Sequence, residues 1–160
     1  MSIHVVARLD EVPPGTRKVV EVAGREIGVF NVDGELFAVR NRCPHMAGPL
    51  CEGYVSGAVS STTPGEYHFD RVGEILRCPW HQWEFDMRTG QSWFDPARVR
   101  VRAYQARIAS GASLVATDEA PATTTDAAPP AEGMVPGPYV AETYPVSVEH
   151  DYIVVDLLSR

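Results

Sequence analysis

Two short segments carry the residues best suited to chemistry. Cys43-Pro44-His45 and Cys78-Pro79-Trp80-His81 each place one cysteine close to one histidine. Thiolates and imidazoles are side chains with which proteins hold zinc, copper and iron. The proline after each cysteine has a fixed φ, which lowers the freedom of the loop and helps to hold two ligands toward one centre. The two segments therefore predict a metal site with four ligands, Cys43, His45, Cys78 and His81.

The order of these four residues bears on the metal. Structural zinc sites usually place two cysteines close together and two histidines close together. Here each segment supplies one residue of each kind. A [2Fe–2S] cluster can use that order, with both thiolates on one iron and both imidazoles on the other. A zinc site and a vestigial, empty site remain as alternatives.

The motif C-x-H followed by C-x-x-H resembles the signature of the Rieske iron–sulfur family. Residues 43–50 are similar to the first cluster loop of that family, and residues 78–90, the more specific stretch, are similar to the second. The resemblance implies an all-β Rieske fold with one Rieske-type [2Fe–2S] cluster per chain. It also implies that Cys43, His45, Cys78 and His81 bind the cluster, with the two histidines facing solvent or a partner.

The sequence departs from the family pattern in three places. His45 and Cys78 are separated by 32 residues, longer than the usual interval, so 54–73 looks like an insertion. Gln82 stands where the family more often has glycine. Cys51 has no counterpart, and we expect a reduced, partly buried thiol with a structural role.

The resemblance also bears on the reduction potential. High-potential members join the two cluster loops by a disulfide at positions that match Gly48 and Trp80, and they place hydroxyl groups at positions that match Trp83 and Phe85. None of these four residues supplies the thiol or hydroxyl. Because hydrogen bonds to sulfur raise the potential, we expect a low-potential cluster near the bottom of the range of roughly −150 to +300 mV.

Strands are expected on both sides of the two segments. Runs rich in β-branched and other apolar residues predict strands at 16–22, 25–32, 35–39, 99–108, 113–117 and 143–158. Asp33-Gly34 joins two of these runs and predicts a tight hairpin, because both residues tolerate the positive φ that such a turn needs.

The whole chain, 1–160, is expected to form a single Rieske domain. Residues 1–42 and 92–160 would form an antiparallel β-sandwich base, with a smaller cluster-binding subdomain, 43–91, inserted between them. Within the insertion, the polar stretch 56–65 indicates a surface loop or an irregular hairpin. Residues 118–133 contain no aromatic or large aliphatic side chain and therefore predict a mobile loop.

Other chemically capable residues have plainer interpretations. The tryptophans are expected to cover the cluster and pack the core. Glu84 and Asp86 are expected to face solvent or to pair with nearby arginines. Three further histidines, His4, His68 and His150, are interpreted as surface or turn residues. A basic group is either a solvated strand face or a docking patch; its members are Arg98, Arg100, Arg102 and Arg107.

Charge and composition exclude several classes of partner. The net charge is −7, and the whole excess falls in residues 118–160, because residues 1–117 hold equal numbers of acidic and basic side chains. This balance argues against nucleic acid or an anionic membrane as the main partner. No apolar run approaches the ~18 residues that span a bilayer, and three cysteines do not suit a disulfide framework. We therefore expect a soluble cytoplasmic protein.

By resemblance, the chain is expected to be a Rieske-type ferredoxin, a one-electron carrier between redox partner proteins such as a reductase and a terminal oxygenase. A standalone hydroxylase is not expected, because His150 is the only histidine after His81 and cannot supply a second iron site. The alternative is a redox-sensing or structural iron–sulfur subunit of a larger complex.

Overall fold

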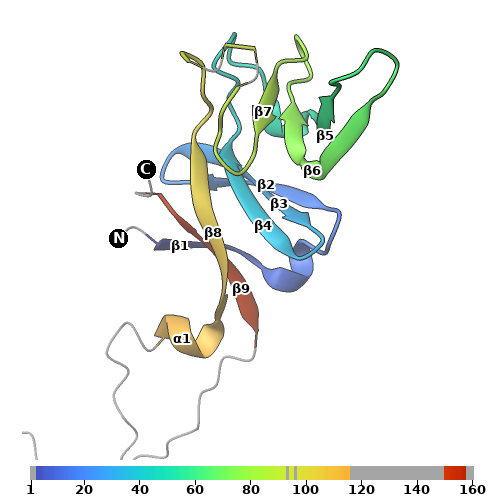
Figure 1. Cartoon of the computed structure of the whole chain (residues 1–160). Helices are drawn as coiled ribbons and strands as arrows, with labels where there is room; N and C mark the ends of the chain where they lie inside the picture. The colour runs from blue at the N-terminus through green and yellow to red at the C-terminus, as the bar shows by residue number, and fades with distance from the viewer. Residues whose placement is uncertain (1–2, 93, 96, 116–149, 158–160) are drawn as a thin grey trace, which may run out of the picture.

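A computed structural model describes residues 3–92, 94–95, 97–115 and 150–157 of the chain. The described part is nearly all β (Figure 1). Its strands are β1 (Ile3–Arg8), β2 (Arg17–Val22), β3 (Arg25–Val32), β4 (Glu35–Arg40), β5 (Tyr54–Ser60), β6 (His68–Arg77), β7 (Glu84–Asp86), β8 (Ala103–Ser110) and β9 (Asp151–Asp156). Three short helices accompany them: η1 (Leu9–Glu11), η2 (Leu50–Glu52) and α1 (Gly111–Val115). Among the described residues, no helix is long and apolar enough to cross a membrane.

The base of the molecule is a six-stranded antiparallel sheet in the order β1-β9-β8-β4-β3-β2. The sheet surrounds a hydrophobic core, to which strands from both halves of the strand order contribute buried side chains. Val29 of β3 and Ala38 of β4 contribute from one half, and Ile153 and Val155 of β9 from the other. The base therefore holds a complete hydrophobic core without the residues of the predicted metal site.

Two tight hairpins give the base its register. Ala23-Gly24 and Asp33-Gly34 link β2 to β3 and β3 to β4, and all four residues have positive φ, between 50° and 95°. Two-residue turns with positive φ match the twist of antiparallel strands. The predicted Asp33-Gly34 hairpin is confirmed, and so are the strands expected within 16–39.

A second sheet, in the order β5-β6-β7, stands above the end of the base (Figure 1). A second core lies where this sheet meets the base. It combines Val39 of β4 with Leu76 of β6, Phe85 of β7 and two cysteines, Cys43 and Cys78. The candidate metal site is thus built on a packed junction between the two sheets.

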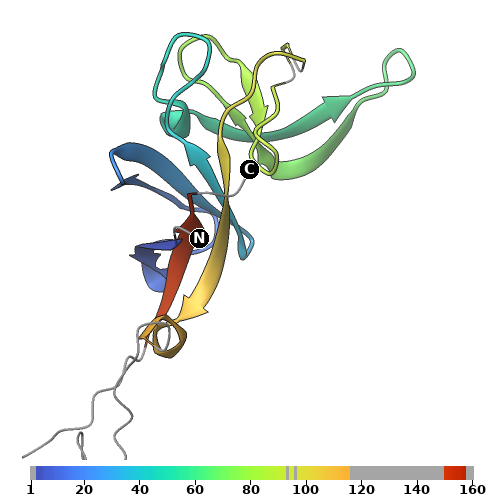
Figure 2. The same ribbon diagram turned by 90° about the vertical axis from the view of Figure 1, so that its left-hand side faces the viewer.

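The segment 54–73, expected to be an insertion, forms most of a long hairpin of β5 and β6. Its outer half projects away from the body of the molecule (Figure 2). Val59 pairs with Phe69 there, and both side chains are exposed. The polar stretch 56–65, predicted as a loop or irregular hairpin, forms the outer part of β5 and the turn of this hairpin, whose register shifts between Ser56 and Ala58.

Two of the predicted strands are corrected by the structure. Residues 111–115 form α1, whereas 113–117 was predicted as a strand. The reason is local, because Ser110 Oγ accepts a hydrogen bond from the Ser113 N–H at 3.2 Å and so starts a helical turn. The strand predicted from residue 99 begins at Ala103. The loop at 118–133 and the residues 143–149 of another predicted strand lie outside the described residues, while β9 covers 151–156.

Candidate metal centre

Two loops of the same construction present the candidate ligands. In the first loop, residues 43–48, the Cys43 N–H donates to the carbonyl of Gly48 and the Cys43 carbonyl accepts from the Ala47 N–H. In the second loop, residues 78–83, Cys78 bonds in the same way to Trp83 and Gln82. Each loop therefore bends back on its own cysteine, which fixes the cysteine and leaves the intervening residues at the tip.

Both loops bend through a left-handed residue at the same position. Ala47 has φ 63° and Gln82 has φ 64°, and each lies four residues after its cysteine. Glycine adopts this conformation with least strain, and other residues incur a cost. This explains in physical terms why a glycine would suit position 82, where the sequence has glutamine.

The four candidate ligands meet as two pairs. Cys43 and Cys78 are buried, with 2% and 1% of their surface exposed, whereas His45 and His81 are exposed at the tip. The imidazole rings lie 4.7 Å apart between centroids, at an angle of 78°. Among the described residues, no three His, Cys, Asp or Glu side chains gather as they would around a single ion. The structure thus places the two thiols together inside the junction and the two imidazoles together at the exposed tip.

The electrostatics of the thiol pair fit a cationic centre. Burial raises the pKa of the Cys43 thiol, and the neighbouring Cys78 raises this pKa further. Thiols of this kind form thiolates only when a positive charge offsets the cost, and an iron centre supplies that charge. Two buried soft donors beside two solvent-facing imidazoles match the ligands of a two-iron cluster with mixed ligation.

Aromatic side chains surround the imidazoles. The Trp83 ring stacks on His45 at 4.1 Å between centroids and on Phe94 at 4.2 Å. The Trp80 ring lies edge-on to His81 and covers Gly48, where a built Cβ would approach it to 2.9 Å. Trp80 therefore joins the two loops by packing, at the two positions where high-potential Rieske proteins are expected to carry a disulfide. The third tryptophan, Trp93, lies outside the described residues.

Cys51 lies apart from the thiol pair. Its side chain is fully buried, so the expectation of a partly buried thiol is corrected. Burial raises the pKa of the Cys51 thiol to about 12, and its Sγ lies 3.6 Å from the carbonyl oxygen of Val39. All three cysteines are free. The Cys51 side chain packs against Gly28, and any larger residue at position 28 would collide with it. Cys51 therefore has a packing role.

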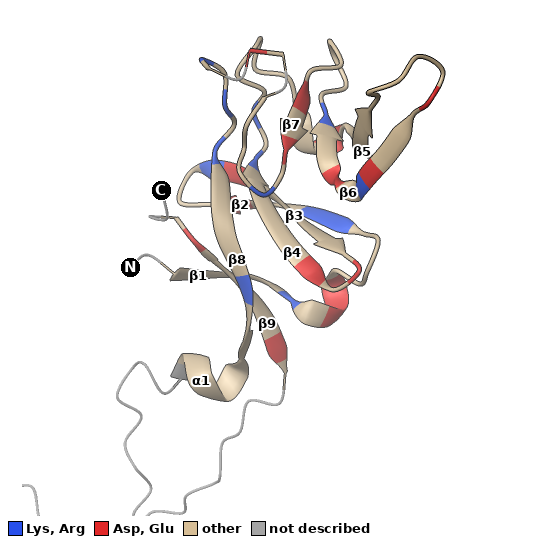
Figure 3. Ribbon diagram, in the orientation of Figure 1, with Lys and Arg blue, Asp and Glu red and all other residues tan. Residues whose placement is uncertain are grey.

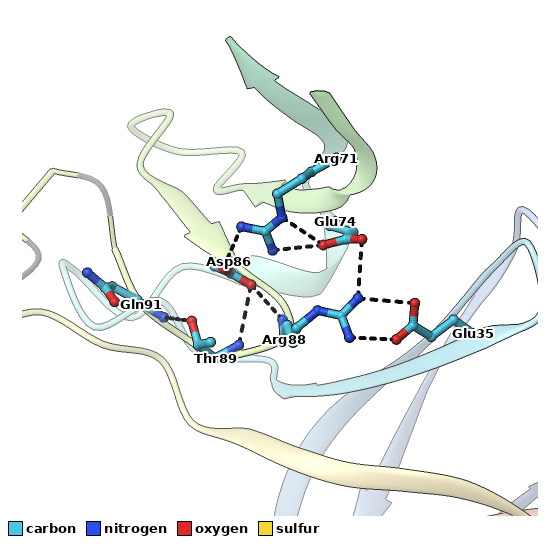
Figure 4. A network of polar contacts seen from close by, with 7 residues as sticks. All are labelled: Glu35, Arg71, Glu74, Asp86, Arg88, Thr89 and Gln91. Carbon is cyan, nitrogen blue, oxygen red and sulfur yellow. Dashed lines mark hydrogen bonds and ion pairs between the residues drawn. The ribbon is translucent and has the colours of Figure 1, made fainter. Parts of the chain in front are cut away.

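A network of ion pairs connects the base to the second sheet, and only part of it is evident from the sequence (Figure 4). Arg71 bridges Asp86 and Glu74, and Arg88 bridges Glu74 and Glu35 of β4. The expectation that Asp86 and Glu84 pair with arginines is confirmed, since Glu84 pairs with Arg77. No local pattern could reveal the link between Glu35 and Arg88, because 53 residues separate them.

The remaining histidines do not join the site. His4 lies in β1 opposite Val155, His68 is exposed in β6, and His150 precedes β9 and is exposed. Their interpretation as surface or turn residues agrees with these positions.

Comparison with known proteins gives one family. Residues 2–105 match the Rieske [2Fe-2S] domain. The chain is 30% identical over 102 residues, 64% of this chain and 83% of the relative, to the ferredoxin component of the naphthalene 1,2-dioxygenase/salicylate 5-hydroxylase systems of Ralstonia sp.. It is 30% identical over 109 residues, 68% of this chain and 85% of the relative, to the biphenyl dioxygenase ferredoxin subunit of Pseudomonas sp. (strain KKS102).

Solved structures agree with this result. The ferredoxin of carbazole 1,9a-dioxygenase from Nocardioides aromaticivorans IC177 superposes with a TM-score of 0.50 at 27% identity, covering 67% of this chain and 89% of that one. A ferredoxin from Sphingomonas yanoikuyae B1 gives a TM-score of 0.51 at 25% identity, covering 69% and 93%. The similarity therefore extends over most of each relative and about two thirds of this chain.

Proposed function

Because the chain belongs to the Rieske [2Fe-2S] family, we propose that it is a ferredoxin that passes single electrons to a terminal oxygenase. The observation that carries the proposal is the pair of buried thiols beside the pair of exposed imidazoles. The named roles of the relatives, which are ferredoxin components of dioxygenase systems, support the oxygenase as acceptor.

Four residues would hold the cluster. Cys43 and Cys78 would bind one iron from inside the junction, and His45 and His81 would bind the other at the tip. When bound, the cluster supplies a centre that takes up and releases one electron. The loop hydrogen bonds hold the two cysteines, and stacking on Trp83 orients His45. The exposed imidazoles give a partner the shortest approach to the site.

The division of the chain into a base and a cluster-binding subdomain belongs to the same proposal. Residues 43–91 would form the cluster-binding subdomain, and 1–42 with 92–160 would form the base. A core within the base and another at its junction with the second sheet support this division. A cytoplasmic location is also proposed, since three free cysteines suit a reducing compartment.

The ligand assignment is tested by single alanine variants at Cys43, His45, Cys78 and His81. Each is expected to lose most of its iron and acid-labile sulfide, and the visible absorption of the reducible cluster. Cys51→Ala and His68→Ala are matched controls of the same residue types outside the site, and both are expected to keep the cluster. Circular dichroism checks that each variant is folded. Retention of a full cluster by any of the four site variants would remove that residue from the assignment.

The carrier role is tested on the intact protein by stopped-flow kinetics. Reduced protein, freed of excess reductant, is mixed with excess ferricytochrome c, separated from the cytochrome, rereduced with dithionite and mixed again. A carrier is expected to deliver one electron per cluster, rapidly and over repeated cycles. A cluster that serves structure or sensing alone would reoxidise slowly, and that result would favour the alternative of a redox-sensing or structural subunit.

A further inference from the structure

A cleft of about 510 Å³ lies beside the first loop and is lined by arginines. Its lining comes from the end of β4, from residues 43–47 of the first loop and from the segment 100–102 that leads into β8. His45 is among the lining residues. The charged side chains in the lining are Arg40, Arg42, Arg100 and Arg102.

The backbone explains why these arginines gather. The segment 98–102 alternates in exposure, with Val101 buried and Arg98, Arg100 and Arg102 exposed. An extended chain points successive side chains to opposite sides, so the valines enter the core and the arginines face outward. The Arg40 N–H donates to the carbonyl of Arg102 at 2.9 Å, which places this segment alongside the end of β4. Figure 3 shows the basic residues along the segment that leads into β8.

Two of the four arginines in the cleft, Arg40 and Arg100, lack a balancing acidic side chain within the part of the chain that the structure describes. The lining of the cleft contains no carboxylate. Elsewhere, Arg71, Arg77 and Arg88 of the second sheet each pair with an acidic side chain. Among the described residues, Arg40 and Arg100 form no ion pair at all. Two arginines without an acidic partner in the described structure, Arg40 and Arg100, beside the proposed redox site are a feature of an interaction surface.

We propose that this cleft docks a carboxylate-rich surface of the redox partner against the His45 side of the site. The proposal rests on the proposed function, which makes His45 a point of electron exit. Guanidinium groups suit this role, because they bind carboxylates through paired hydrogen bonds and remain charged at all relevant pH values. Opposite charges on the partner would speed encounter and select the orientation in which electrons cross.

A protein surface fits the cleft better than nucleic acid. The four arginines occupy one short cleft, whereas nucleic acid would extend beyond it over a chain of net charge −7. The Debye length is about 8 Å at physiological ionic strength, so a compact acidic patch interacts chiefly with the charges nearest to it, which here are the arginines of the cleft.

The test uses the whole protein and poly-L-glutamate as an acidic polypeptide probe. Binding is measured by calorimetry at low ionic strength for the wild type, Arg40→Glu, Arg100→Glu and the double variant. Arg107→Glu is the control, because Arg107 is an exposed arginine of β8 outside the cleft and the change in charge is the same. We expect the double variant to bind at least about tenfold more weakly and the control to stay within about twofold.

A second readout uses electron transfer. Oxidation of the reduced protein by the anion ferricyanide is expected to slow with rising salt and to be about tenfold slower in the double variant at low salt. The rate with a cationic cobalt(III) complex is expected to change in the opposite direction. Equal effects of Arg107→Glu and the cleft variants in both assays, or tighter binding of a DNA duplex of equal charge, would overturn the docking site.

The two proposals fail separately in these experiments. Arginine-dependent binding of polyglutamate by a protein that does not cycle electrons would overturn the carrier role alone. Rapid cycling by a protein whose polyglutamate binding and ferricyanide oxidation do not depend on Arg40 or Arg100 would overturn the docking site alone.

Discussion

At the scale of the residue, the sequence reveals the candidate ligands but not the backbone conformations of the loops that hold them. The four candidate ligands stand out by type and spacing, so the sequence selects them without a structure. The left-handed residue Ala47 does not stand out, because alanine is typical of other conformations, and Gln82 stands out only through the resemblance, which has glycine there. Their positive φ follows from hydrogen bonds within each loop, and these only the folded chain shows.

The strain at position 82 gives a direct prediction. Gln82→Gly is expected to be more stable to unfolding than Gln82→Ala by about 1 kcal/mol, because glycine adopts positive φ without a steric cost. Chemical denaturation of both variants measures the difference, and both should retain the cluster. Equal stability of the two variants would show that φ at this position is not strained.

At the scale of the element, local signals predict hairpins well and distant pairings poorly. Asp33-Gly34 specifies its turn within two residues. The local pattern predicts no separate strand at Ile3–Arg8, and this segment pairs with β9, whose residues lie more than 140 positions later. The strand predicted at 113–117 competes with a helical turn that one serine hydroxyl stabilises. The Arg40–Arg102 contact is another long-range pairing, so the arginine-lined cleft is visible only in the fold.

The ion-pair network between the two sheets predicts that substitution of a buried member lowers the free energy of unfolding more than substitution of an exposed member. Asp86 is buried and accepts from Arg71 and from the N–H groups of Arg88 and Thr89. Asp86→Ala removes the buried acceptor that these donors share and is expected to lower the free energy of unfolding by about 3 kcal/mol. Arg88→Ala removes exposed pairs and should cost less than about 1 kcal/mol. Urea unfolding distinguishes the two, and equal losses would contradict the account of the network.

The same network predicts a loss of stability in acid. Burial opposes the charged form of Asp86, but hydrogen bonds from Arg71 and two backbone N–H groups outweigh it and lower the pKa of Asp86. Arg71 also lowers the pKa of Glu74. A lowered folded-state pKa stabilises the fold above the unfolded pKa of about 4, and this stabilisation is lost as pH falls through the folded value. Unfolding should therefore become easier below about pH 4, with a smaller pH dependence in Asp86→Asn.

The outer half of the β5–β6 hairpin is expected to be dispensable for the fold. Its residues 59–69 are all exposed, so they bury little apolar surface. Replacing 59–69 with Asn-Gly, which suits a two-residue turn, is expected to change the free energy of unfolding by less than about 1 kcal/mol and to keep the cluster. Thermal unfolding and iron content measure both. Loss of the cluster would show that this arm supports the site.

At the scale of the whole molecule, the two sheets hold buried thiols at their junction and exposed imidazoles at one end. The junction core surrounds Cys43 and Cys78 with apolar side chains, among them Phe85. Neither Trp83 nor Phe85 carries a hydroxyl, and all three cysteines are free. The side-chain hydroxyl donors that the resemblance places near the sulfur atoms of high-potential members are therefore missing, which favours a low reduction potential.

The predicted midpoint potential lies near the bottom of the range of about −150 to +300 mV for Rieske centres. Phe85→Tyr is expected to raise it, because the added hydroxyl can donate to sulfur. Phe37→Tyr in the same core is the control and should leave the potential nearly unchanged. Redox titration measures all three proteins. A wild-type midpoint above about +100 mV at neutral pH would contradict the prediction.

The most direct test of the central claim is pulsed electron paramagnetic resonance of the reduced protein, grown with ¹⁵N-labelled histidine. Ligation by His45 and His81 predicts two strongly coupled histidine nitrogens on one iron, unchanged in His4→Gln, His68→Gln and His150→Gln. A spectrum with no strongly coupled histidine nitrogen, or one that loses a nitrogen in any of these three variants, would contradict the assignment of the two pairs as the ligands of the cluster.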